Sequence, residues 1–251
     1  MTEQLPKRQK IRKAMIFLSA ILFPITIFYF SPYLIFIAAG NHVIGGSAIL
    51  FISMLLFSCF FGRLFCGYVC PGAGFGEMAG CVNPKAPKLG KRRYIRYVIW
   101  VIWLAAVLGL YIKCWPIEKV DPLFATNYGI SVSTIEEYMP YYLVVAILFG
   151  MPLVLGKRAV CHYICWMAPF MDIGMWIRRK LHLPGVHIEM EAEKCISCKK
   201  CTKACPMGLD VAEMVKAGEL LESECAMCGA CIDTCPKEVL SYKIKAKKNK
   251  K

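Results

Sequence analysis

Eight cysteines near the end of the chain form two copies of the run Cys-x2-Cys-x2-Cys-x3-Cys-Pro, at Cys195–Pro206 and Cys225–Pro236. In runs of this spacing, three thiolates of one run and the fourth thiolate of the other run enclose each [4Fe–4S] cube. The sequence therefore predicts two [4Fe–4S] clusters and chemistry based on electron transfer. The two expected ligand sets are Cys195, Cys198 and Cys201 with Cys235, and Cys225, Cys228 and Cys231 with Cys205.

Structural zinc is the alternative for so many cysteines in so short a segment. Zinc sites usually present two Cys-x2-Cys pairs, whereas each run here has three closely spaced cysteines followed by a Cys-Pro pair. The spacing therefore favours iron–sulfur clusters over zinc.

The remainder of the chain has the composition of a membrane protein. Of its 251 residues 57% are hydrophobic, above the roughly 45–50% of ordinary globular domains. Four apolar stretches approach the roughly 20 residues that a membrane-spanning helix requires, namely 14–39, 44–65, 94–112 and 141–155. The first could instead be a signal peptide, but it is longer than the 7–15 apolar residues of such a peptide, so we expect it to be retained.

The basic residues predict the orientation of these spans. The net charge of +14 is unevenly distributed: basic residues precede the first stretch, separate the second from the third and follow the fourth, whereas only Lys113 and Lys119 lie on the opposite side. By the positive-inside rule, both termini and the iron–sulfur segment are predicted to be cytoplasmic, in a cell inner (cytoplasmic) membrane protein with several spans. Because topology accounts for the charge, nucleic acid is not expected as a partner.

A degenerate repeat occurs where the second and fourth stretches end. Cys66 and Cys70 enclose Gly-Tyr-Val, and Cys161 and Cys165 enclose His-Tyr-Ile. If a helix continues through each copy, cysteines four residues apart lie on one helix face, close enough to serve one metal centre. Buried cysteines can also be simple apolar side chains, which we accept for the isolated Cys59 and Cys114. The sequence predicts a further iron–sulfur centre on Cys66, Cys70, Cys161 and Cys165, with Cys81 as an alternative ligand.

The segments Phe65–Gly72 and Cys161–Phe170, together with the terminal double run, resemble the polytopic membrane ferredoxins. That group is similar to the ferredoxin-type quinol dehydrogenase component of periplasmic nitrate reductase systems and to the membrane core of the nitrous-oxide-reductase regulatory protein. The family pattern has Cys-x3-Cys-Pro twice, whereas here Trp166 replaces the second proline. The resemblance implies electron exchange between the membrane quinone pool and other redox proteins.

The expected fold is therefore an α-helical membrane protein of about four spans, with an internal pseudo-repeat and a C-terminal α+β two-cluster ferredoxin domain. The expected parts are a basic cytoplasmic tail (1–13), the four-span domain (14–169), an amphipathic linker (170–185), the ferredoxin domain (186–242) and a basic tail (243–251).

Three polar residues near the membrane cysteines have alternative interpretations. His162 could accept a proton or donate a hydrogen bond to a cluster ligand, Glu77 could relay protons, and Arg63 could favour the reduced state of a cluster by its charge. Each could equally be an ordinary residue at the membrane interface.

The sequence has no Gly-rich dinucleotide motif, so flavin or nicotinamide chemistry would belong to a partner. The leading interpretation is an electron-transfer subunit of an oxidoreductase of the quinol dehydrogenase type, working between quinone or quinol and a redox partner protein. The alternative is a maturation or regulatory protein that supplies electrons for metal-centre assembly.

Overall fold

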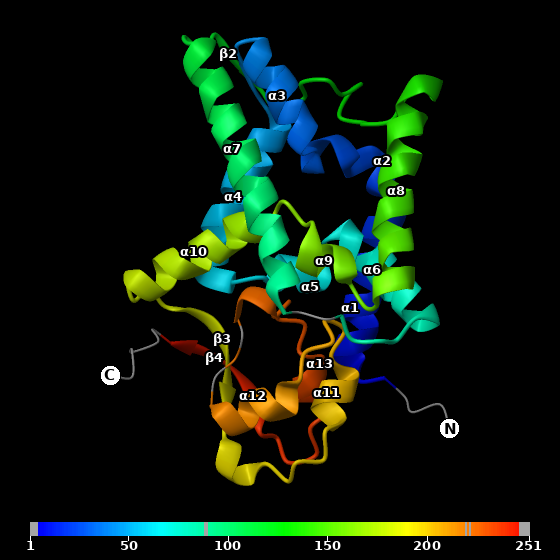
Figure 1. The fold of residues 1–251 in the computed structure, drawn as a ribbon, viewed down its shortest axis with the longest axis vertical. Coiled ribbons are helices and arrows are strands. Elements are labelled where there is room, and N and C mark those ends of the chain that lie inside the picture. Colours follow the sequence, from blue (N-terminus) through cyan, green and yellow to red (C-terminus); the bar gives the residue numbers. More distant parts are fainter. Residues whose placement is uncertain (1–4, 88–89, 219, 221, 246–251) are drawn as a thin grey trace.

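The computed structural model describes residues 5–87, 90–218, 220 and 222–245. Figure 1 shows an elongated molecule, with long helices in its upper half and short helices with a small sheet in its lower half. The elements of the upper half and of the layer below it are α1 (Lys7–Ile21), α2 (Phe23–Thr26), η1 (Ile27–Phe30), α3 (Pro32–Gly40), β1 (Val43–Gly45), α4 (Gly46–Phe61), α5 (Leu64–Tyr68), α6 (Pro71–Val82), η2 (Lys91–Tyr94), α7 (Ile95–Lys113), β2 (Lys119–Asp121), α8 (Ile135–Leu155), α9 (Ala159–Tyr163) and α10 (Ala168–Lys180).

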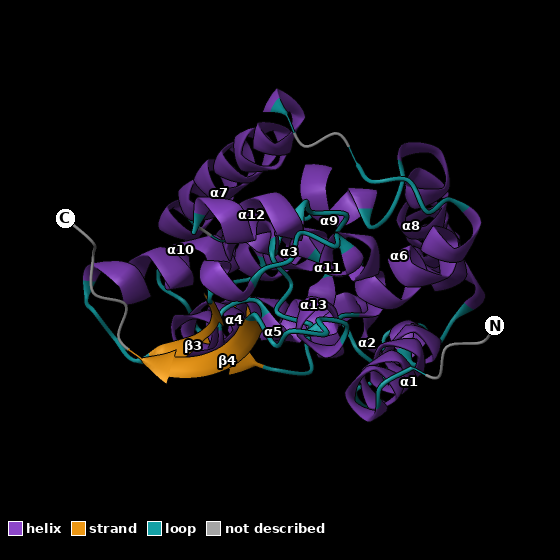
Figure 2. Cartoon of the chain, turned by 90° about the horizontal axis from the view of Figure 1, so that it is seen from below, coloured by secondary structure: helices purple, strands orange, loops and turns teal. Residues whose placement is uncertain are grey.

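The lower half is formed by the C-terminal part of the chain. Its elements are β3 (Gly185–Met190), η3 (Ala192–Lys194), α11 (Lys200–Ala204), α12 (Val211–Ala217), η4 (Glu222–Glu224), α13 (Ala230–Asp233) and β4 (Leu240–Lys245). Strands β3 and β4 pair in antiparallel fashion, with Ile188 opposite Tyr242. The view from below in Figure 2 places this sheet at one edge of a largely helical mass. The predicted basic tail (243–251) lies outside the described residues from 246 onward.

Two helices of the described chain are long and apolar enough to cross a membrane, Lys91–Lys113 and Ile135–Leu155. A third crossing is reached if α1 and the Phe23–Phe30 segment, which meet at 63°, form one bent span. Pro24 explains the break, because its ring lacks an N–H and clashes with the preceding helical turn. Helix α4 is apolar but has only 16 residues. Two to three helices could thus cross a membrane, and the prediction of four spans stays a prediction.

The long helices and the helices that follow the cysteine motifs pack crosswise. Helices α4 and α6 flank the first cysteine motif, and helices α8 and α10 flank the second. Helix α4 packs on α10 and helix α8 packs on α6, so the main helix contacts are between the two copies of the repeat. Gly174 permits the first contact, since a Cβ at this position would collide with the Ser58 hydroxyl group and lie 2.5 Å from the Leu55 carbonyl oxygen. The two copies are therefore interlocked, and the segments that carry the membrane cysteines are held side by side beneath the long helices.

Candidate functional site

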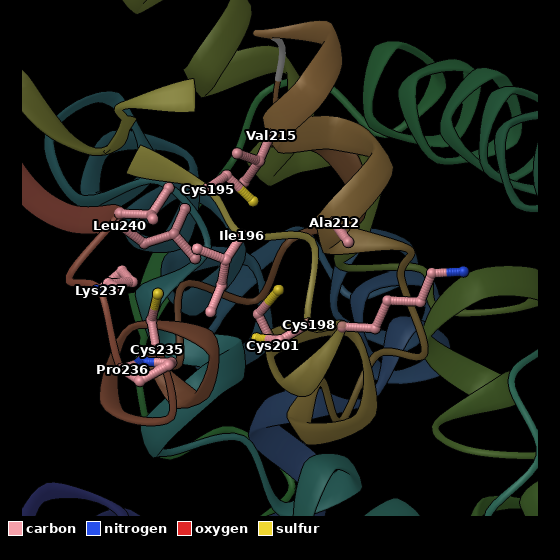
Figure 3. Close-up of a pocket in the computed structure, with 12 residues that line it drawn as sticks. Cys195, Ile196, Cys198, Cys201, Ala212, Val215, Cys235, Pro236, Lys237 and Leu240 are labelled. Carbon is pink, nitrogen blue, oxygen red and sulfur yellow. The ribbon is translucent and has the colours of Figure 1, made fainter. Parts of the chain in front are cut away.

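The first pocket of the lower half is lined by Cys195, Cys198, Cys201 and Cys235, which we call the distal set. Figure 3 shows these four side chains around one space, with Cys235 coming from the second cysteine run. The loop bends sharply because Ser197 and Lys199 have φ values of 55° and 57°. Apolar side chains, including Val215 and Leu240, form most of the remaining wall, to which Lys199 and Lys237 also contribute.

The second pocket is lined by Cys225, Cys228, Cys231 and Cys205, which we call the proximal set. Its loop repeats the first one, because Met227 and Gly229, at the corresponding positions, have φ values of 53° and 72°. The structure thus brings together in each pocket the cysteines that the sequence assigned to one cluster. That they bind the clusters remains a prediction.

The two sets differ in exposure and lie next to each other. Cys198 of the distal set is exposed, whereas Cys205 and Cys228 of the proximal set are buried. Burial raises the pKa of the Cys225 thiol to about 12, and burial and neighbouring thiols, including that of Cys201, raise the pKa of the Cys231 thiol. Thiolates in such a place need a strong positive charge nearby, which bound iron supplies.

The membrane cysteines lie in two short helices and in the turns after them. The helix does not continue through either motif, because α5 ends at Tyr68 and α9 ends at Tyr163, before the second cysteine of each pair. Pro71 disfavours helical backbone at Cys70, which is extended with φ −61° and ψ 123°. The second copy has the same turn without a proline, since Cys70 N–H donates to Phe65 O and Cys165 N–H donates to Val160 O.

Cys66, Cys70, Cys161 and Cys165, which we call the membrane set, nevertheless converge. Cys70, Cys161 and Cys165 line one apolar cavity with side chains such as Phe23 and Leu148. Burial raises the pKa of the Cys66 and Cys70 thiols, and other thiols of the set raise each further. Cys66 Sγ lies 3.3 Å from Met171 Sδ.

The cysteines of the chain form no disulfide bonds. In the described part of the chain, no three histidine, cysteine or acidic side chains lie close enough together to share a single metal ion. Cys81, the alternative ligand, is exposed and bonds to the Glu77 carbonyl oxygen at 3.4 Å.

A layer of buried charges separates the membrane set from the lower half. On one side, Glu77 accepts hydrogen bonds from Arg12 at 2.6 and 2.9 Å and pairs with Arg158. Arg158 also donates to the Cys66 carbonyl oxygen at 3.2 Å. Burial opposes the charge of Glu77, but the two arginines outweigh burial and hold the pKa of its carboxyl below the ordinary range. The two arginines thus favour the ionised form of Glu77.

The other side of the layer is centred on Glu224. Arg96 donates to both of its carboxylate oxygens, at 2.9 and 3.0 Å, and also pairs with Asp172 at 3.3 Å. His162 Nδ1 lies 2.8 Å from Glu224, and His162 Nε2 lies 3.0 Å from the Met207 carbonyl oxygen. Burial would raise the pKa of Glu224, but His162 and Arg96 outweigh it and the pKa falls. His162 therefore links the second membrane motif to the loop after Cys205.

Sequence reasoning singled out only Arg63, Glu77 and His162 of this layer. The repeat itself held a signal for two more residues. Arg158 stands three residues before Cys161 as Arg63 stands before Cys66, and Asp172 follows Cys165 at the same distance as Glu77 follows Cys70. Arg12, Arg96 and Glu224 lie outside the repeated motif, so no spacing could have found them.

Family models match the cysteine-bearing regions. Residues 187–236 match a 4Fe-4S dicluster domain, and residues 44–88 and 139–184 match a 4Fe-4S binding domain. The second match covers both membrane motifs and confirms the internal repeat as a sequence feature. No solved structure matches the chain significantly.

Several curated proteins are similar to the chain over most of its length. The uncharacterized protein MJ0750 of Methanocaldococcus jannaschii is 28% identical over 74% of this chain and 74% of its own. The putative electron transport protein YccM of Escherichia coli is 24% identical over 75% of this chain and 53% of its own. The protein RdxA of Cereibacter sphaeroides is 26% identical over 81% of this chain and 45% of its own. The chain is thus similar to 4Fe-4S proteins, and one of its relatives is named as a putative electron transport protein.

Proposed function

We propose that the chain is a membrane-bound iron–sulfur protein that passes electrons between the quinone pool and a redox partner. The observation that carries this proposal is the spatial order of the three cysteine sets. The membrane set lies beside the apolar helices, the proximal set follows it, and the distal set lies nearest the exposed surface. Cys66 and Cys161 pack against the hydrophobic core that contains Cys205, and Cys231 of the proximal set lies near Cys201 of the distal set. When bound, iron–sulfur clusters supply one-electron transfer.

The donor sets fit the proposed cofactors. Each pocket of the lower half has four cysteines and apolar walls, as a [4Fe–4S] cluster requires. For the membrane set we propose a third iron–sulfur centre, supported by the cavity that Cys70, Cys161 and Cys165 line and by the match of both motifs to a 4Fe-4S binding domain.

A quinone is the proposed partner on the membrane side. The cavity of the membrane set has walls from Phe23 of α2 and from Val144 and Leu148 of α8, a helix that could cross a membrane. A hydrophobic carrier in the bilayer could therefore approach these thiols without leaving apolar surroundings.

A soluble protein is the proposed partner at the distal set. The exposed loop at Cys198 carries Ile196, which is 59% exposed, and is followed by Lys199 and Lys200. Helix α11, which carries Cys201 of the distal set, lies in the half of the molecule away from the long apolar helices (Figure 1). A positive surface at this place favours a partner with an acidic face.

Iron and sulfide counts test the third centre. Two [4Fe–4S] clusters account for roughly eight irons, and a further centre raises the count to roughly ten or twelve. The double variant Cys66→Ser with Cys161→Ser should lose only the additional iron, and the control Cys59→Ser with Cys114→Ser should keep it. A count of about eight in all three proteins would refute the membrane centre.

Reduction by a quinol analogue tests the electron path. The anaerobically purified protein, mixed with a menaquinol analogue, should become reduced at the C-terminal clusters, and the Cys66→Ser, Cys161→Ser protein should not. Dithionite, which reaches the exposed distal set directly, should reduce both. Failure of the intact protein to react with quinol would favour the maturation or regulatory role over quinol oxidation.

A further inference from the structure

Two arginines occupy equivalent positions in the repeat and are fully enclosed. Arg63 and Arg158 each stand three residues before the first cysteine of a membrane motif, and each is 1% exposed. An arginine at a membrane boundary usually extends its head group into water. These two instead direct their head groups into the layer between the membrane set and the proximal set.

Each of the two guanidinium groups contacts both sides of this layer. Arg158 donates to the Cys66 carbonyl oxygen at 3.2 Å, and the same nitrogen lies 3.8 Å from Met207 Sδ, two residues beyond Cys205. Arg63 donates to the carbonyl oxygen of Ser223, two residues before Cys225. The Cys66 thiol lies within the electrostatic reach of Arg63, as the thiol of Cys225 does.

The positive charge of the layer exceeds its negative charge. Four buried arginines, Arg12, Arg63, Arg96 and Arg158, face three carboxylates, Glu77, Asp172 and Glu224. Among the described residues, Arg63 has no carboxylate within salt-bridge distance, and its Nε has no hydrogen-bond partner. The carboxylates of Asp172 and Glu224 act on the Arg63 charge only from beyond salt-bridge distance, so a further anionic group close to Arg63 would stabilise this buried charge.

We propose that Arg63 and Arg158 are positioning residues for electron transfer, which stabilise the reduced state of the iron–sulfur centres on both sides of the junction. This inference rests on the proposed function. Cysteine-ligated clusters gain negative charge on reduction, and a guanidinium within a few ångströms in a poorly solvated place favours the more negative state. The distal set lies on the far side of the proximal set, so its potential should depend little on either arginine.

Redox titration of the full chain, followed by electron paramagnetic resonance, tests this role. Signals are first assigned to the sets by their loss in Cys66→Ser, Cys225→Ser and Cys198→Ser proteins. Arg63→Gln should shift the midpoint potentials of the membrane and proximal signals to lower values and leave the distal signal in place. Arg63→Lys, which keeps the charge, should leave the midpoints close to those of the wild type, and the exposed Arg92→Gln should cause no shift.

Arg158→Gln should shift the same two signals, with Arg158→Lys as its charge-preserving counterpart. Because Arg158 also pairs with Glu77, the glutamine variant could fail to load its clusters. Arg63→Gln and the two lysine variants then decide the question. Unchanged midpoints in Arg63→Gln, or an equal shift of all three signals, would overturn the proposal.

The result of the redox titration can be distinguished from the results that test the proposed function. If the iron count shows no membrane centre, the proximal midpoint must still fall in Arg63→Gln. If the iron count and the quinol reaction are as expected but no midpoint moves, only the role of the arginines is refuted.

Discussion

Equivalent positions of the repeat carry Gly67 and His162, and each residue meets the C-terminal half differently. At Gly67 the backbone itself makes the contact, because a Cβ would collide with the Ala226 carbonyl oxygen and lie 3.3 Å from Cys228 Cα. At His162 the imidazole spans the distance to Met207 and Glu224. The two copies of the repeat thus contact the C-terminal half at different distances. A glycine lets the backbone approach closely in the first copy, and a long polar side chain reaches across in the second.

Replacing Gly67 by alanine should therefore separate the proximal set from the membrane set. The added methyl group cannot be accommodated without moving backbone, and overpacking of this kind typically costs about 1–3 kcal/mol. We expect a lower thermal midpoint in detergent, faster proteolysis between the two halves and unchanged iron content. Gly80→Ala, whose Cβ would meet only Lys157 Cγ at 3.7 Å, is the matched control and should behave as the wild type.

Replacing Glu77 by glutamine should destabilise the fold strongly, because it leaves Arg12 and Arg158 buried without their common carboxylate. Loss of one partner of a buried pair costs about 3–5 kcal/mol. The folded pKa of Glu77 is lowered, so its contribution is complete above the ordinary glutamate pKa and disappears as the pH falls through the folded value.

Thermal unfolding as a function of pH checks this expectation. The difference between wild type and Glu77→Gln should be large at neutral pH and shrink in acid. Glu136→Gln, at an exposed position, should differ little from the wild type at any pH. A difference that is constant across the pH range would show that the charge of Glu77 is not what stabilises the layer.

At the scale of elements, the sequence predicts some features well and others poorly. The cysteine runs predict which thiols share a pocket, since three ligands within seven residues impose a local loop that repeats at Ser197 and Met227. The helices end inside the membrane motifs, at Tyr68 and Tyr163, and the spacing of the cysteines does not show where a helix ends. The pairing of Arg96 with Glu224 joins residues 128 positions apart, and no local pattern reports such a contact.

The short helices and the sheet of the lower half should not fold without their clusters when produced alone. The segment 186–242 is small, and part of its core is completed by Leu64, Cys66 and Cys161 of the other half. A domain of this size lacks sufficient core, so metal binding must supply folding free energy. Circular dichroism of the iron-free segment should show no cooperative unfolding, and a sharp thermal transition would contradict this expectation.

For the whole molecule, the predicted orientation places both ends and the cysteine pockets in the cytoplasm. The start of α1, with Lys7 and Arg8, lies in the same half of the molecule as the cysteine pockets, whereas α7 ends at Lys113 at the opposite end (Figure 1). Reporter fusions after Lys251 and near Glu136 should therefore report opposite compartments. Two fusions with the same activity would contradict the orientation.

The crosswise packing of the repeats has a consequence for the biosynthesis of the protein. The membrane set is complete only when Cys165 has been synthesised, and Cys66 and Cys161 are then covered by residues made later, Met207 and Ala226 among them. On the proposed third centre, iron for these thiols would have to arrive after the second repeat is made and before the C-terminal half closes over them. The order of translation thus sets a time window for maturation, and a C-terminal half that closes too early would seal an empty site.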